Sequence, residues 1–120
     1  MKIESKLVFK LGILLGILAM VAGSAGAHSI KFESDYHKEL FNTGTFYLFV
    51  HIPVIMILGV LGIIKPAILM FSGAFLFSVP LWTKGIGVFN GGIVVPVGGM
   101  MMIAAWIWLL FVGNEEKKSK

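Results

Sequence analysis

The sequence has no cysteine and no arginine, and charged residues make up only 13% of its 120 residues. The absence of cysteine excludes a disulfide framework, a thiolate metal site and a thiol nucleophile. The ten lysines are scattered at the ends of apolar runs and do not form a basic patch interleaved with aromatic residues. The composition therefore does not indicate a nucleic-acid-binding protein.

Apolar residues, in contrast, are abundant. They make up 58% of the chain, and the mean hydropathy is +0.94. A small chain buries only a limited fraction of its surface when it folds, so a soluble domain of this length cannot hide so much apolar area. We therefore expect an integral protein of the cell (plasma) membrane, with the lipid bilayer as its first partner.

Four long segments carry no Asp, Glu, Lys or Arg, and a helix needs about 20 apolar residues to cross the hydrocarbon core of a bilayer. These segments predict an all-α, integral membrane four-helix bundle that forms one domain over residues 1–120, with an outer loop at 27–42 and a charged tail at 114–120. The uncharged segments are 11–30, 40–64, 66–83 and 85–114, and the predicted helices span roughly 7–26, 43–64, 66–83 and 93–113.

Lysine placement predicts the orientation of the helices. In a four-helix topology, seven lysines share the side of the two termini and three lie on the other side. Because positive charge is enriched on the cytoplasmic side, both termini are predicted to be cytoplasmic. The tryptophans Trp82, Trp106 and Trp108 lie near predicted helix ends, which is typical of an interfacial aromatic belt.

The segment "GSAGAHS" at 23–29 has two interpretations. Ala25-Gly26-Ala27 fits a signal-peptidase site, and cleavage there would give an exported protein that holds a metal with His28 at its N-terminus. Alternatively, the run from Leu7 to Ala27 is an uncleaved membrane helix. We favour the helix because Gly12 and Gly16, Ala19 and Gly23, and Ala22 and Gly26 form small-xxx-small pairs, which signal peptides do not need.

A polar stripe runs along the second predicted helix, where Thr43, Tyr47 and His51 follow each other at intervals of four. An ionisable side chain at membrane depth is by default a candidate functional residue. One interpretation makes His51 a proton-relay, quinone-binding or haem-ligating residue, with His28 as a second ligand. The other makes it a neutral side chain that holds helices together through Ser72, Ser78 or the Phe49 carbonyl, which Pro53 leaves free.

The loop between the first two helices has two further interpretations. Phe32, Tyr36 and Leu40 recur every four residues, as in a short amphipathic helix at the head-group level, and a solvated loop is the alternative. Nitrogen and oxygen ligands for a metal also gather there, but their spacing matches no metal motif. These residues are His28, Glu33, Asp35, His37 and Glu39.

Five short segments occur together in a fixed order: "GSAGAH" at 23–28, "TGTFYLFVH" at 43–51, "FSG" at 71–73, "PVGG" at 96–99, and Trp106. In this order the chain resembles the YgdD / transmembrane protein 256 family, catalogued as domain of unknown function 423. The resemblance spans about residues 7–112. It implies a small four-helix membrane protein whose segment 23–28 belongs to the first helix, and it implies no particular activity. The charged loop at 29–42 departs from many members.

The sequence shows no nucleophile with a base and an orienting group, and no carboxylate pair in the membrane, so no catalytic residue, cofactor or metal is expected. We predict a non-enzymatic structural or accessory subunit that packs against other membrane proteins or itself. The alternative is a small-molecule or proton-handling protein, such as a transporter component, centred on His51 and Tyr47. The residues expected at helix contacts are Gly12, Gly16, Gly23, Gly26, Gly73, Gly98 and Gly99.

Overall fold

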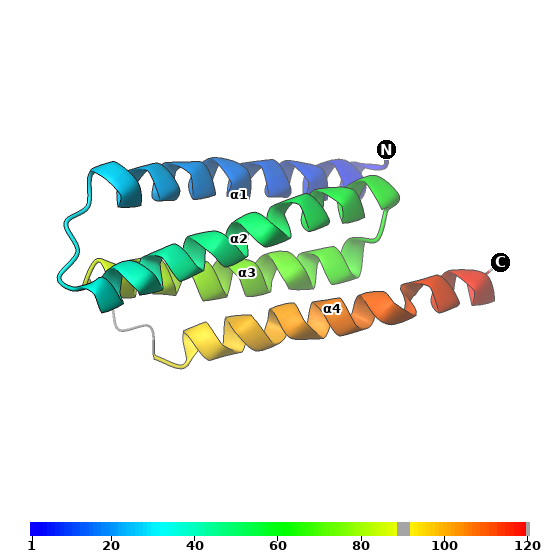
Figure 1. Ribbon diagram of the computed structural model, residues 1–120. Helices are drawn as coiled ribbons and strands as arrows, with labels where there is room; N and C mark the ends of the chain where they lie inside the picture. The colour runs from blue at the N-terminus through cyan, green and yellow to red at the C-terminus, as the bar shows by residue number, and fades with distance from the viewer. Residues whose placement is uncertain (89–91, 120) are drawn as a thin grey trace.

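In the residues that it describes, the computed structural model has four α-helices (Figure 1). It describes the backbone of residues 1–88 and 92–119, and the side chains of residues 1–88 and 92–112. No strand occurs in these ranges, and each helix is long and apolar enough to cross a membrane, as expected for an all-α membrane protein. The helices are α1 (Ile3–His28), α2 (Asp35–Leu61), α3 (Ile64–Gly85) and α4 (Val94–Ser119).

The helices pack in the order of the chain, so the bundle is a row with α2 and α3 at its centre (Figure 1). α1 packs on α2 and touches α3, whereas α4 packs on α3. Within the described residues, no Cα atom of α4 comes within 8 Å of a Cα atom of α2. The molecule is correspondingly flat, with extents of 55 × 25 × 16 Å. Both termini lie at the same end, which the lysine distribution predicts to be cytoplasmic.

The connection between α1 and α2 is shorter than the expected loop at 27–42. α1 continues to His28, so the segment at 23–28 forms its last turns, and α2 begins at Asp35. The physical reason is the N-cap: the hydroxyl of Ser34 accepts a hydrogen bond from the backbone N–H of His37 at 3.3 Å. The carboxylate of Asp35 lies in the first turn, where the helix dipole favours negative charge. Residues 35–42 therefore belong to α2, and the separate amphipathic helix is not formed.

Substitution of Ser34 by alanine should fray this first turn. Loss of the N-cap hydrogen bond typically costs about 1 kcal/mol. We expect faster hydrogen exchange at the amides of residues 36–38 and unchanged exchange in the centre of α2. Ser34→Asp is the matched control, since its carboxylate also caps a helix, and equal exchange in both variants would show that the cap does not determine where α2 begins.

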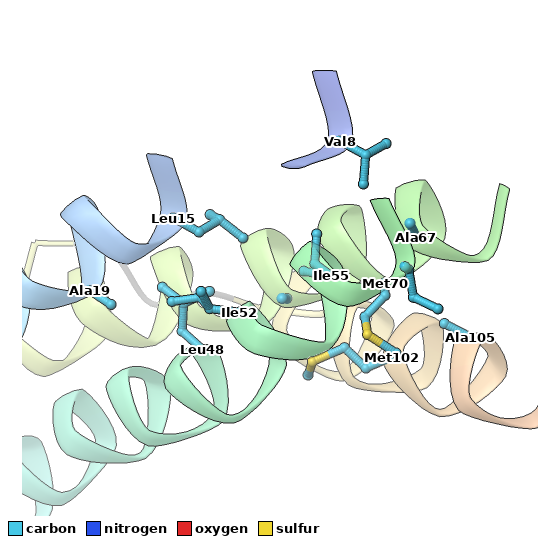
Figure 2. Close-up of a cluster of buried hydrophobic side chains, with 12 residues drawn as sticks. Val8, Leu15, Ala19, Leu48, Ile52, Ile55, Ala67, Met70, Met102 and Ala105 are labelled. Atoms are coloured by element: carbon cyan, nitrogen blue, oxygen red, sulfur yellow. The ribbon is translucent and has the colours of Figure 1, made fainter. Parts of the chain in front are cut away.

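The core is a cluster of buried side chains contributed by all four helices (Figure 2). Leu15, Leu48, Ile55 and Met70 are its largest fully buried apolar members. Alanines fill positions where neighbouring helices approach closely, which is how transmembrane helices achieve tight packing without a hydrophobic driving force. The fully buried alanines are Ala19, Ala67, Ala74 and Ala105.

The glycines of α1 face α2 of the same chain. A Cβ on Gly12 would lie 2.5 Å from the side chain of Met56, and a Cβ on Gly26 would lie 2.7 Å from the ring of Phe41. The small-residue face of α1 is therefore occupied within the chain. The other two glycines are less crowded: Gly16 is near Ile52, and Gly23 is near Thr45 and Phe49.

The closest helix approach joins α3 and α4 at Gly73 and Gly98. A Cβ on Gly73 would lie 2.9 Å from the carbonyl oxygen of Gly98, and a Cβ on Gly98 would lie 2.8 Å from the carbonyl oxygen of Gly73. The neighbouring Gly99 is less crowded, since a Cβ there would lie 3.4 Å from the ring of Phe77. This contact fixes the position of α4, and with it the position of Trp106.

Candidate functional site

His51 lies in the interior of the bundle, with 5% of its surface exposed. Its Nδ1 lies 2.6 Å from the backbone carbonyl oxygen of Tyr47, one helical turn earlier in α2. Its Nε2 accepts a hydrogen bond of 2.9 Å from the indole Nε1–H of Trp106 on α4. The two rings meet edge to face, with centroids 5.8 Å apart. A single tryptophan thus joins α4 to α2, although their backbones do not meet.

The two partners assign the tautomer of His51. An indole N–H only donates and a carbonyl oxygen only accepts, so Nε2 must be free of a proton and Nδ1 must carry one. This arrangement is a neutral imidazole with both nitrogens bonded. A metal or haem iron at Nε2 would have to displace the Trp106 N–H, and so would a proton delivered there. The geometry suits a side chain that holds two helices together.

The hydrogen-bond partners predicted for His51, which were Ser72, Ser78 or the Phe49 carbonyl, are wrong. The acceptor is the carbonyl of Tyr47, which lies four residues before His51, and the donor is Trp106. The Ser78 hydroxyl donates instead to the carbonyl of Gly44 at 2.8 Å.

The predicted position near a helix end holds for Trp82, three residues before the end of α3, but not for Trp106, because α4 continues to Ser119. The indole of Trp82 donates to the hydroxyl of Thr45 at 2.9 Å, and that hydroxyl donates to the Phe41 carbonyl at 3.1 Å. Both tryptophans therefore donate their indole N–H groups to side chains of α2. A buried indole N–H needs such a hydrogen-bond partner. One feature of the sequence could have indicated this role for Trp106. The residue lies well inside the apolar span Val94–Val112 and not at its end.

A cavity of about 280 Å³ lies beside His51, between α2, α3 and α4. It exists because α2 and α4 are separated and because Gly99 projects no side chain into the space. Aromatic rings and a thioether form most of its wall. The lining residues are Tyr47, His51, Phe77, Gly99, Met102, Ile103 and Trp106.

Thr43 and Tyr47 line a second, more open groove of about 560 Å³, whose described lining residues all belong to α2 and extend to its first residue, Asp35. Tyr47 belongs to both spaces, so the predicted stripe of Thr43, Tyr47 and His51 follows one path along α2. The other lining residues of this groove are Asp35, Lys38, Glu39, Asn42 and Phe46.

His28 is placed apart from this path. It is exposed at the last residue of α1, whereas His51 is buried in the middle of α2. The histidine of the charged segment, His37, pairs with Glu33 at 3.4 Å and with the hydroxyl of Ser34 at 2.8 Å. Among the described residues, no group of three or more His, Asp or Glu side chains is arranged to hold a metal ion.

Comparison with known proteins agrees with the fold. The chain is 28% identical over 118 residues to UPF0382 membrane protein SAB0533 of Staphylococcus aureus (strain bovine RF122 / ET3-1). The alignment covers 88% of this chain and 93% of the relative. No solved structure matches the chain. With four apolar spans and a membrane-protein relative, the chain is a multi-pass membrane protein. Residues 22–99 match the family described as "Protein of unknown function (DUF423)", and the chain belongs to that family.

Proposed function

We propose that this protein is a non-enzymatic accessory subunit that packs through α4 against a transmembrane helix of another membrane protein. One observation carries the proposal: only 17% of the membrane span of α4 is buried within the chain, against 22% for α1 and 44% for α2 and for α3. The α4 span is 19 residues long, and in the described part of the chain α3 is the only helix whose backbone comes close to it.

The exposed surface of α4 contains a stripe suited to helix packing. Four exposed residues, which we call the α4 seam, recur at i, i+4, i+7 and i+11 and so lie on one face of the helix. One of them is an alanine, and a small residue there permits close approach of a second helix. Methionine and phenylalanine are also among them, and both residue types are enriched at interfaces. The α4 seam is, in order, Met100, Ala104, Ile107 and Phe111, so that the alanine is its second member and methionine and phenylalanine are its two ends.

The other exposed helix, α1, is less suited than α4 to packing against another membrane protein. Its glycines are used against α2, and its exposed face at Ile13, Ile17 and Val21 is made of branched aliphatic side chains that suit lipid tails. The non-enzymatic part of the proposal rests on His51, because both of its nitrogens are engaged in helix packing.

Site-specific photo-crosslinking in native membranes tests the proposal. A photoreactive phenylalanine analogue at Ile107, in the α4 seam, is expected to give an adduct with one other protein, identified by mass spectrometry. The matched control is the same analogue at Val21, which is equally apolar and also exposed, at 64% against 53% for Ile107. Adducts of two copies of this chain would replace the accessory role with self-association, and lipid adducts alone at both positions would overturn it.

A further inference from the structure

The separation of α2 from α4 leaves a groove open to the bilayer. α3 forms its floor through Phe77, and the hydrogen bond between His51 and Trp106 closes its deep end. The wall on α4 is Gly99, Met102 and Ile103, and Ile103 is 60% exposed, so the space is continuous with the lipid around it. A space of this kind at membrane depth is filled by hydrocarbon, because water finds few hydrogen-bonding partners there.

Charged groups lie beyond Tyr47, in the wider groove on α2, which shares this residue with the groove between α2 and α4 and whose described lining residues all belong to α2. This wider groove runs past Asn42 to two carboxylates and one ammonium, those of Asp35, Glu39 and Lys38. These three side chains complement a headgroup that carries both a phosphate and an ammonium group. They repel one that carries only negative charge, since two carboxylates face it and a single lysine attracts it.

The length of the groove matches one leaflet of a bilayer. Nine residues separate Asn42 from His51, which corresponds to about 14 Å along a helix. Half of a hydrocarbon core is about 15 Å. His51 also lies near the middle of the uncharged segment at 40–64, between Glu39 and Lys65. The deep end of the groove is therefore near the bilayer midplane, where an acyl chain from one leaflet ends.

We propose that the groove between α2 and α4 is a binding site for one zwitterionic phospholipid. An acyl chain lies against Phe77, Met102 and Ile103 and ends at the His51–Trp106 pair. The phosphate is bound by Lys38, and the headgroup ammonium by Asp35 and Glu39. This site is separate from the α4 seam, and the proposal does not depend on the accessory role.

Native mass spectrometry of the full chain tests the site. The protein is reconstituted into vesicles of equal parts phosphatidylethanolamine and phosphatidylglycerol, and is then released in mild detergent. We expect one retained phosphatidylethanolamine per chain. Gly99→Leu, which fills the cavity, should lower retention about tenfold, equivalent to a loss of 1.4 kcal/mol in binding. Met100→Leu is the matched control, because this neighbouring residue is 71% exposed and does not line the cavity.

Two further measurements keep the test independent of folding. The double substitution of Asp35 and Glu39 by lysine should reverse the preference toward phosphatidylglycerol. In the unmodified protein, a phosphatidylethanolamine with a photoreactive acyl chain should label Tyr47 or Met102. Equal retention by the Gly99→Leu and Met100→Leu variants, no preference between the two lipids, or labelling confined to α1 would overturn the proposal. A lipid-free dimer would show that a second copy covers the groove.

Discussion

Substitution of Gly98 by alanine is expected to separate α4 from α3 and to destabilise the protein by about 3 kcal/mol, the upper range for overpacking a well-packed site. The new Cβ would lie 2.5 Å from the backbone nitrogen of Phe77 and 2.7 Å from the carbonyl carbon of Leu76. Both contacts are with backbone atoms, which cannot rotate away as the end of a side chain does. Equilibrium unfolding in mixed detergent and SDS measures the effect.

Gly99→Ala is the control for this prediction. Its Cβ would meet only the ring of Phe77, at 3.4 and 3.6 Å, which is ordinary contact. Both variants gain the same intrinsic helix propensity, about 1 kcal/mol for glycine to alanine. Their difference therefore isolates the clash at Gly98. Equal stability of the two variants would mean that α3 and α4 are not in close backbone contact at this point.

Substitution of Trp106 by phenylalanine should also have a large effect, because it leaves Nε2 of His51 buried without a donor. An unsatisfied buried polar group costs about 1–3 kcal/mol, and the loss of the hydrogen bond removes the direct link between α2 and α4. Unfolding in mixed detergent and SDS measures the loss. Trp108→Phe, two residues along the same helix, is the matched control, and it is expected to have a smaller effect.

A double-mutant cycle tests whether the pair acts as one unit. His51→Leu removes the acceptor, so adding Trp106→Phe to it should cost less than Trp106→Phe alone, with a coupling energy of about 1 kcal/mol. Strictly additive effects would show that the two side chains are energetically independent. If the His51→Leu protein kept its stability but lost a bound small molecule other than phospholipid, the proton- or ligand-handling alternative would be favoured instead.

Much of the fold follows from the pattern of charge along the chain. Uncharged segments of about 20 residues predicted four helices, because charged groups are expensive in hydrocarbon and the backbone must be bonded within each segment. The same logic misplaced the start of α2. Charges at 33–39 exclude that stretch from lipid, but they do not exclude a helix, and the cap at Ser34 lets α2 begin in the head-group region.

The candidate site could be predicted only in part from the sequence. The spacing of Thr43, Tyr47 and His51 predicted that they share one side of α2, since four residues correspond to about one turn. In the structure Tyr47 lines one groove with Thr43 and a cavity with His51. The partner of His51 is 55 positions away, and no local pattern relates the two. The glycines of α1 illustrate the same limit, because a small-xxx-small pair packs equally well against a neighbour in the same chain or in another.

The sequence by itself determined that the protein lies in a membrane and that it crosses the bilayer as helices. These properties depend on short-range periodicity and on the cost of charge in lipid. Only the tertiary structure decided that the helices form a row, that Trp106 bonds to His51, and that a groove remains between α2 and α4. Those features depend on which helices approach closely. Close approach depends in turn on backbone contacts between residues far apart in the chain, such as Gly73 and Gly98.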